Sequence, residues 1–303
     1  MIWNFSCEHI PVLKKVRRKY RTWKLEFFKH YNPKRYADYL FKDQFGYGID
    51  WNHPRDLNEW INYLAFKTDT REWSRLADKY SVREYVLSKG LGHILIPLYG
   101  VWDDVDAIDF NKLPNSFAIK TNCGSGDTIL IRDKKSEDLE EVRKRLNSAL
   151  TSRFGMESAE PHYLRIKPLI IAERLLPPPT NIDYKIWCFN GTPDCIMTMS
   201  NRDIDSCTYD RNVYDLKWES HKEWLASLYR NNVDVPKPAR LEEMIEYARI
   251  LSEGFPQVRV DFYHTEEGVF LGEMTFTASC GRMSSFSKER LIIMGQKVQE
   301  GIK

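Results

Sequence analysis

The cysteines of this sequence form none of the spaced pairs that hold zinc or a redox-active disulfide. They lie scattered through the 303 residues, as Cys7, Cys123, Cys188, Cys195, Cys207 and Cys280. No CxxC pair occurs, and no group of His and Cys residues has the spacing of zinc ligands. Unpaired thiols of this kind are typical of a reducing compartment. The pattern excludes a disulfide scaffold and the common zinc modules.

Long hydrophobic runs and an excess of one charge are missing as well. No segment approaches the roughly 20 apolar residues of a membrane span, and the start MIWNFSCEHIPVLKKVRRKY lacks the apolar stretch of a signal peptide. Lys and Arg number 45 against 43 Asp and Glu, so the formal net charge is only +2. This balance favours no nucleic-acid partner. We therefore expect a cytoplasmic protein.

The N-terminal region is the exception to this even charge. Val12, Val16, Tyr20, Trp23 and Phe27 are spaced so that a helix over residues 12–31 would carry them in one apolar stripe. The rest of that helix would be basic, with Glu26 as its acid. A basic amphipathic helix can lie on an anionic membrane surface. It can equally be a solvated helix packed on its own domain, and the sequence leaves both readings open.

The remaining chain predicts helices first and then an α+β body. It has 42% hydrophobic and 29% charged residues, as expected for a globular protein. The expected helices are residues 52–66 capped by Asp56 or Asn58, residues 76–90 closed by Gly90, residues 134–150 capped by Ser136, and residues 240–254. The expected strands are residues 93–102, 116–122, 128–133 and 168–176, with hairpins over 183–201 (turn Asn190-Gly191) and 258–276.

The hairpin VRVDFYHTEEGVFLGEMTF carries an acid on each strand. Alternation places Arg259, Asp261 and Tyr263 on one face of the first strand. A turn centred on Glu267 would place Asp261 directly across from Glu273. Because facing like charges destabilise a sheet, a positive group should lie between them. Hard oxygen ligands of this kind suit Mg²⁺; an ion pair centred on Arg259 is the alternative.

Two further segments have the character of a nucleotide site. In FAIKTNCGSGD, Lys120 ends a strand, and Gly124, Ser125 and Gly126 would allow backbone N–H groups to approach phosphate oxygens. The segment has neither the Gly-Lys-Ser/Thr of a P-loop nor the spacing of a dinucleotide fingerprint. In IIAERLLPPPTNIDYK, an apolar strand runs to Glu173 and is stopped by three prolines. Read singly, each segment is also compatible with an ordinary turn or edge strand.

In their order along the chain, these segments resemble the ATP-grasp superfamily, and most closely its TupA-like family, named for teichuronopeptide biosynthesis. The motifs FAIKTNCGSGD, IIAERLL, DYKIWCFNG, VRVDFY and GEMTFTASCG carry the resemblance over roughly residues 70–295. It implies an ATP-grasp fold, in which two α+β subdomains clasp ATP, preceded by a mainly helical N-terminal region. The corresponding divisions are residues 1–70 (helical), 71–112 (before the lid), 113–171 (lid subdomain) and 172–303 (catalytic subdomain).

The resemblance also implies roles for individual residues. Lys79, Lys120 and the loop Gly124–Gly126 would contact phosphates, and Lys185 would belong to the same nucleotide site. Glu173 with the backbone near Leu175 and Leu176 would hold adenine, and Asp183 the ribose. Lys217 would reach the γ-phosphate side, Arg259 would steady the transferred phosphoryl group, and Asp261 and Glu273 would bind Mg²⁺. Thr275 stands where many ATP-grasp ligases have asparagine, which puts a second Mg²⁺ in doubt.

The implied activity is a carboxylate–amine ligase that uses ATP and Mg²⁺ in the synthesis of bacterial surface polysaccharides. Its substrates would be a carboxylate, such as a uronic acid, and an amine, at least one of them linked to a saccharide. Acceptors carried on membrane lipid would fit a membrane-binding helix over residues 12–31. Two other functions stay open: an ATP-dependent sugar kinase, and a glycan-assembly protein with a vestigial nucleotide site.

Overall fold

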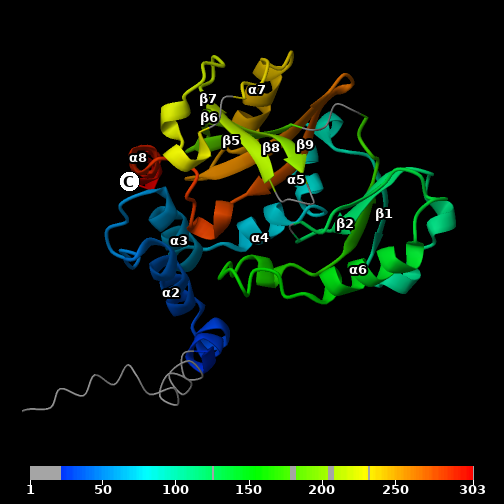
Figure 1. Cartoon of the computed structure of the whole chain (residues 1–303), viewed down its shortest axis with the longest axis horizontal. Coiled ribbons are helices and arrows are strands. Elements are labelled where there is room, and N and C mark those ends of the chain that lie inside the picture. The colour runs from blue at the N-terminus through cyan, green and yellow to red at the C-terminus, as the bar shows by residue number, and fades with distance from the viewer. Residues whose placement is uncertain (1–21, 125, 178–181, 204–207, 231–232, 303) are drawn as a thin grey trace, which may run out of the picture.

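The protein consists of a helical N-terminal region followed by two antiparallel sheets (Figure 1). The computed structural model describes residues 22–302, apart from 125, 178–181, 204–207 and 231–232. The expected helix over residues 12–31 therefore falls partly outside the described residues; residues 22–31 are helical. Over the part of the chain described, no helix is both long enough and apolar enough to cross a bilayer.

Four helices follow residues 22–31. They are α2 (Pro33–Phe45), α3 (Leu57–Lys67), α4 (Arg71–Ala77) and α5 (Val82–Ser88). Asp56 is the N-cap of α3, since its carboxylate accepts from the Glu59 N–H at 3.0 Å. The single helix expected over residues 76–90 is wrong. The chain breaks at Asp78, whose carboxylate accepts from the Tyr80 N–H and the Ser81 hydroxyl. Local side-chain bonds of this kind compete with the helix, and the break sets Lys79 in a turn.

The smaller sheet has the strand order β1-β4-β2-β3. Its strands are β1 (Leu98–Trp102), β2 (Phe117–Thr121), β3 (Ile129–Ile131) and β4 (Ile170–Glu173), and helix α6 (Leu139–Thr151) packs on it. Strand β1 is shorter than expected and half exposed, because it forms an edge. Helix α6 is capped by Asp138 rather than Ser136, since the Asp138 carboxylate accepts from two N–H groups of the first turn.

The larger sheet has the order β7-β6-β5-β8-β9. Its strands are β5 (Asp183–Phe189), β6 (Thr192–Asp203), β7 (Thr208–Tyr214), β8 (Val258–Thr265) and β9 (Gly268–Thr275), with helices α7 (Leu241–Leu251) and α8 (Lys288–Ile302). Asn190 and Gly191 form the expected turn, both with positive φ. The described 3-10 helices are Gly92–Ile94, Val105–Ala107, Phe110–Lys112, Tyr163–Arg165, Lys222–Trp224, Ser227–Tyr229 and Ala278–Gly281.

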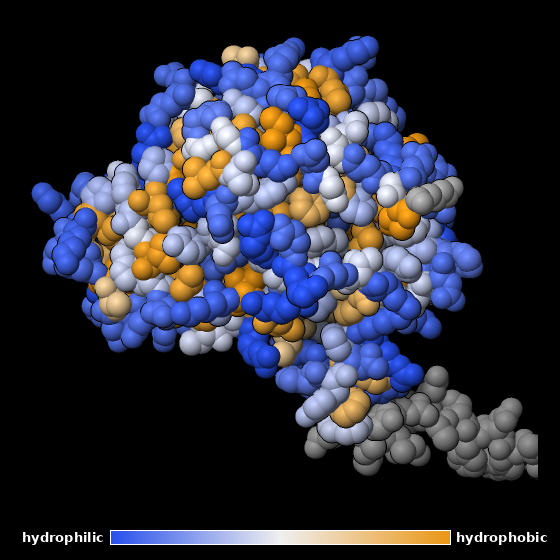
Figure 2. Space-filling view, turned by 180° about the vertical axis from the view of Figure 1, so that it is seen from behind, coloured by the Kyte–Doolittle hydropathy of each residue, from blue (hydrophilic) through white to orange (hydrophobic). Residues whose placement is uncertain are grey.

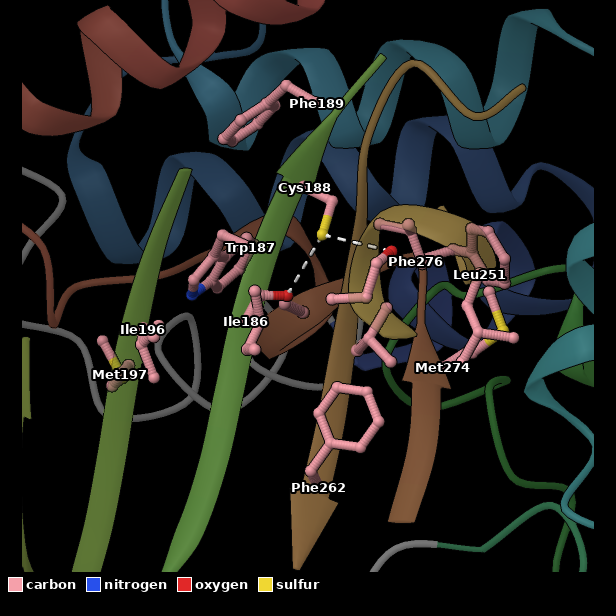
Figure 3. Packing of buried hydrophobic residues seen from close by; sticks show 14 of the residues in the cluster. Ile186, Trp187, Cys188, Phe189, Ile196, Met197, Leu251, Phe262, Met274 and Phe276 are labelled. Carbon is pink, nitrogen blue, oxygen red and sulfur yellow. Dashed lines mark hydrogen bonds between the residues drawn. The ribbon is translucent and has the colours of Figure 1, made fainter. Parts of the chain in front are cut away.

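One face of the larger sheet is an apolar core against α7. Figure 3 shows Cys188, Leu251, Phe262 and Met274 gathered there, and the Cys188 thiol lies 3.8 Å from the carbonyl oxygen of Ala248 in α7. Burial raises the pKa of Cys188 to about 12, so this thiol stays protonated and unreactive. Since side chains alternate across a strand, the neighbours of these residues point to the opposite face.

Candidate functional site

The opposite face of the larger sheet collects the polar residues of three adjacent strands. Lys185 of β5 pairs with Asp261 of β8, which in turn pairs with Glu273 of β9. Arg259 pairs with Thr275 in the next row. Directly paired residues share a face. The predicted placement of Asp261 across from Glu273 is therefore confirmed.

A β-bulge at Gly272 produces this pairing. Near the turn the pairs are Thr265 with Gly268 and Phe262 with Leu271, and beyond Gly272 they become Asp261 with Glu273. The turn thus sets a register one residue shorter than the sequence suggested, and the bulge restores it. Strict alternation along FLGEMTF predicts that Leu271 shares a face with Glu273; the bulge instead turns Leu271 to the α7 core with Phe262, so that prediction is wrong.

Arg259 lies between the two acids. Its Nε and Nη2 donate to the Asp261 carboxylate at 2.6 and 2.7 Å, and Nη2 also lies 3.0 Å from a Glu273 oxygen. The Thr275 hydroxyl accepts from the same Nη2 at 3.0 Å and donates to Glu273 at 2.9 Å. Lys185 donates to Asp261 Oδ2, the oxygen that also accepts from Arg259 Nη2. The positive group expected between the acids is therefore, in this structure, an arginine.

Lys79 joins this cluster to the glycine loop. Its ammonium donates to the Gly124 carbonyl at 2.8 Å and lies 3.8 Å from Glu273. The turn that carries it is anchored on β2, since the Lys79 N–H donates to the Asn122 carbonyl and the Asn122 amide donates to Asp78. The Lys79 side chain thus connects the loop after β2 of the smaller sheet to Glu273 on the larger sheet.

Lys120 and Glu173 form a second charged group on the smaller sheet. The Lys120 ammonium lies 2.7 Å from the Glu173 carboxylate, and Arg83 of α5 reaches the other oxygen at 3.6 Å. Both Lys120 and Glu173 are buried, so the pair is shielded from water and salt. The Glu173 carboxylate is therefore held by cations, and the adenine role expected here would fall to the backbone that follows it.

That backbone borders a small apolar cluster. Ile96, Leu176 and Phe270 are buried together, with Tyr263 packed against them. Tyr263 and Phe270 pair across β8 and β9 in the row beyond the bulge, on the face that carries Asp183. The Arg174 N–H donates to the Pro97 carbonyl at 2.8 Å, which fixes the exit from β4. An apolar wall of this kind is suited to a planar heterocycle.

The electrostatics of Glu273 set it apart. Burial by itself would raise its pKa, but Lys79, Arg259 and Lys185 outweigh that effect and lower the pKa to about 2. Glu273 is thus a carboxylate at any physiological pH. Burial opposes the charge of Arg259, yet Asp261 and Glu273 raise its pKa further above the ordinary value.

These residues fit a magnesium nucleotide. Asp261 and Glu273 supply the hard oxygen donors that Mg²⁺ prefers. Among the described contacts, one Glu273 oxygen accepts from Arg259 and Thr275, and the other lies 3.8 Å from the Lys79 ammonium. Counting the groups joined by these ion pairs, the cations Lys79, Arg83, Lys120, Lys185 and Arg259 face the carboxylates Glu173, Asp183, Asp261 and Glu273. The excess cation belongs to the group of Lys120, Arg83 and Glu173, and two cations against one carboxylate favour an anionic ligand there.

One of the expected residues lies away from this cluster, and another is not among the described residues. Lys217 is exposed in the turn after β7, at the edge of the sheet away from β9, and its N–H donates to Asp215. Ser125 lies outside the described residues. Arg83, Ile96 and Phe270 were not found from the sequence. Their contacts join distant segments, and no local motif marks them.

Comparisons with known proteins agree with this geometry. The family model of TupA-like ATP-grasp proteins matches residues 59–299, and no curated protein matches the chain. Among solved structures, the chain is similar to the D-alanine–D-alanine ligase of Bacillus anthracis at 14% identity, over 82% of this chain and 70% of that one, with a TM-score of 0.43. It is also similar to the ATP-grasp ligase PsnB, solved with Mg and ADP, at 12% identity over 81% and 65% with a TM-score of 0.40.

A third structure, the ADP complex of the synthetase PurK, aligns at 12% identity over 81% of this chain and 57% of that one, with a TM-score of 0.42. The family model spans most of the sequence, including both sheets and every described charged residue of the cluster. The fold is α+β with the ATP-grasp arrangement, and the chain belongs to the TupA-like ATP-grasp family.

Proposed function

We propose that the protein is an ATP-dependent carboxylate–amine ligase that forms an amide on a component of a bacterial surface polysaccharide, for example on a uronic acid. Both the carboxylate and the triphosphate are anions, so their approach is opposed by charge. The observation that carries the proposal is Lys79, which contacts the glycine loop at 2.8 Å and lies 3.8 Å from Glu273. One cation thus connects the element that would cover the phosphates to the acids of the catalytic sheet.

The reaction would proceed in two steps. A carboxylate oxygen of the substrate bonds to the γ-phosphorus of ATP while the bond from that phosphorus to the bridging oxygen breaks, releasing ADP. The amine nitrogen then attacks the acyl carbon, the bond to the phosphate oxygen breaks, and the amine proton is lost with inorganic phosphate. Lys79, Lys120 and Arg259 would lie along the charge that develops during the first step.

Asp261 and Glu273 would hold Mg²⁺, which supplies positive charge to the phosphate oxygens when it is bound. Thr275 would contribute at most a hydroxyl, and this hydroxyl is already shared between Arg259 and Glu273. Arg259 would have to release one carboxylate oxygen to the metal. The loop around Gly124 would exclude water from the acyl phosphate. The enzyme would work in the cytoplasm, where ATP is available.

The direct experiment is a screen for ADP release with uronic acids crossed against amino acids and small amines. Release that requires both a carboxylate and an amine supports the ligase. Combined Asp261→Ala and Glu273→Ala substitutions should abolish it, and unchanged turnover in that variant would exclude the metal assignment. Stable phosphorylation of a sugar hydroxyl without an amine would indicate the kinase instead.

A further inference from the structure

The face of the protein seen in Figure 2 is largely hydrophilic, and its hydrophobic residues form scattered patches. Scattered apolar side chains are normal on a protein surface and do not by themselves indicate a partner. A binding site outside the nucleotide cluster is therefore expected to use charge. One hollow, beside α4 and the turn that follows it, has this character. This α4 hollow has a volume of about 450 Å³, which is within the range of small-molecule sites.

Four cationic side chains line the α4 hollow, two from α4 and two from the segment that leads into β4: Arg71, Arg75, Arg165 and Lys167. Among the described residues that line it, Asp78 is the one carboxylate. Three donors already satisfy Asp78, namely the Tyr80 N–H at 2.8 Å, the Ser81 hydroxyl at 2.6 Å and the Asn122 amide at 2.8 Å. The cations therefore dominate the charge inside the hollow, and they favour an anionic ligand.

Three of these cations form ion pairs with acids that do not line the hollow: Arg71 with Asp69, Arg75 with Glu72, and Lys167 with Asp103. The side chains of the three acids are 58%, 46% and 63% exposed. Ion pairs between solvent-exposed groups contribute little free energy, because water screens the charges and the long side chains lose freedom. A ligand in the hollow can therefore compete with these acids for the cations.

Arg165 differs from the other three cations, since its described hydrogen bonds go to neutral oxygens. Its Nε donates to the Ser74 hydroxyl at 3.0 Å, and its Nη2 donates to the Thr70 carbonyl at 2.9 Å and to the Thr70 hydroxyl. These bonds hold the guanidinium against α4 without pairing it to a carboxylate. A guanidinium binds carboxylates and phosphates more strongly than it binds neutral oxygens. Arg165 is therefore suited to be the centre of an anion site.

A buried amide fixes two walls of the hollow. Asn122 donates to Asp78 at 2.8 Å and to the Lys167 carbonyl at 3.1 Å, and its side-chain oxygen accepts from the Leu169 N–H at 2.8 Å. One side chain thus joins the turn after α4 to the segment that carries Lys167. A site whose walls are already held loses little conformational freedom when a ligand binds. Tyr80, which is 40% exposed, adds an aromatic ring to the lining.

We propose that the α4 hollow binds a small sugar that carries a carboxylate or a phosphate, with the anionic group held by Arg165, Arg75 and Lys167. The charge of the ligand follows from these cations. The choice of a sugar rests on the proposed function, in which the substrates are linked to saccharides, and the Tyr80 ring would pack on the sugar ring. The site goes beyond that function, because none of its lining residues belongs to the cluster around Arg259.

The test is isothermal titration calorimetry of the full chain without nucleotide, with glucuronic acid, glucose 1-phosphate, glucose and inorganic phosphate as probes. We expect at least one anionic sugar to bind about tenfold or more tighter than glucose and than inorganic phosphate. The anionic sugar that binds identifies the group as a carboxylate or a phosphate. Arg165→Gln should raise its dissociation constant about tenfold or more, because a charge-assisted contact is lost.

A second variant keeps the contacts of Arg165 with α4 intact, so that a loss of binding is not mistaken for a loss of structure. Arg75→Gln combined with Lys167→Gln should also raise the dissociation constant about tenfold or more. The matched control is Arg249→Gln, since Arg249 is likewise paired with a glutamate, Glu246, on an exposed helix surface. This control should bind the sugar as the wild type does.

Four outcomes would overturn the proposal. Two of them are no binding of either anionic sugar, and binding of glucose as tight as that of the anionic sugars. The third is equal binding of inorganic phosphate and glucose 1-phosphate, which would mean that the hollow takes a simple oxyanion only. The fourth is loss of binding in Lys120→Met with unchanged binding in both hollow variants, which would place the sugar in the nucleotide site. ADP release is measured separately, so a failure of the ligase proposal is distinguished from a failure of this one.

Discussion

At the residue scale, Arg259 is the centre of the candidate site. A single guanidinium contacts Asp261, Glu273 and Thr275, and its ring neighbour is Trp187, with the guanidinium carbon 5.9 Å from the ring centroid. Its planar fork holds Asp261 through two nitrogens in a fixed geometry while Nη2 also reaches Glu273, a bidentate geometry that an ammonium does not provide. Arg259 therefore keeps two like charges together on adjacent strands, and under the proposed function it would contact phosphate oxygens of the nucleotide.

Substituting Arg259 by lysine tests this directly. The Arg259→Lys variant keeps the charge but loses the fork, so we expect ADP release to fall about 100-fold or more, as for the loss of one electrostatic contact to a transition state. Arg249→Lys is the control, because Arg249 is paired with Glu246 on the exposed surface of α7. Retained activity in Arg259→Lys would mean that Arg259 has only a structural role, as the partner of Asp261 and Glu273 in an ion pair.

The depressed pKa of Glu273 gives a prediction for stability against pH. The folded pKa is about 2 and the ordinary value is 4.5. Because the folded value is lower, the ionised group stabilises the protein above about pH 4.5, and this contribution is lost as the pH falls towards 2. The difference in unfolding free energy between wild type and Glu273→Gln should be constant above pH 5 and shrink below it. Urea unfolding at several pH values measures it.

The opposite trend, a difference that grows on acidification, would contradict the assignment. Other carboxylates titrate in both proteins, so the comparison between them isolates Glu273.

The sequence identified Asp261, Glu273 and Arg259 and the face that they share, because strand alternation is a local rule. It offered an ion pair centred on Arg259 as one of two readings without deciding between them, and it could not show that Lys120 pairs with Glu173, since that contact depends on how distant strands pack.

At the element scale, the pairing of Asp261 with Glu273 in the hairpin of β8 and β9 was predicted correctly, although the prediction did not include the β-bulge. Counting from a turn centred on Glu267 gave the pairing of Asp261 with Glu273. The structure reaches the same pair by a tighter turn and a bulge at Gly272, where an added Cβ would lie 3.2 Å from the Asp261 carbonyl oxygen. A bulge depends on the geometry of both strands, so counting residues could not find it. The break at Asp78 was missed for a similar reason, since short side-chain bonds outweighed an apolar periodicity.

Gly295 tests how α8 is fixed to the N-terminal region. In the interior of a helix, Gly295→Ala should stabilise the protein by about 1 kcal/mol from helix propensity alone. The added Cβ would, however, lie 2.7 Å from the backbone carbon of Asp56, at the start of α3. We expect the contact to dominate and the substitution to destabilise by about 1–3 kcal/mol. The control Ile293→Ala removes a 45% exposed side chain from the same helix and should change stability by less than about 0.5 kcal/mol. A stabilised Gly295→Ala protein, measured by urea unfolding, would show that α8 moves freely.

At the scale of the whole molecule, the two sheets have separate main cores, and between them lie the contacts of Lys79 and the small apolar cluster of Ile96, Leu176 and Phe270. The core of the smaller sheet, around Phe117, Ile131 and Leu146, is separate from the main core around α7. The two meet in the charged region where Lys79 contacts both the glycine loop and Glu273. Separate cores of this kind allow one body to move on the other. A nucleotide in that junction would therefore add contacts to both bodies and stabilise the protein as a unit.

Lys79 is the residue at which this coupling can be measured. At about 100 times its dissociation constant, ADP with Mg²⁺ should stabilise the wild type by about 2.7 kcal/mol, seen as a rise in melting temperature. Lys79→Met should lose most of this rise at the same ADP concentration, and hydrogen exchange in β2 and β3 should no longer slow on adding nucleotide. Lys89→Met is the control, because Lys89 forms its ion pair with Glu253, away from the cluster. An unchanged rise in melting temperature in Lys79→Met would mean that the nucleotide stabilises both sheets without this lysine. An unchanged rise for the wild type in the presence of EDTA would mean that nucleotide binding does not require Mg²⁺.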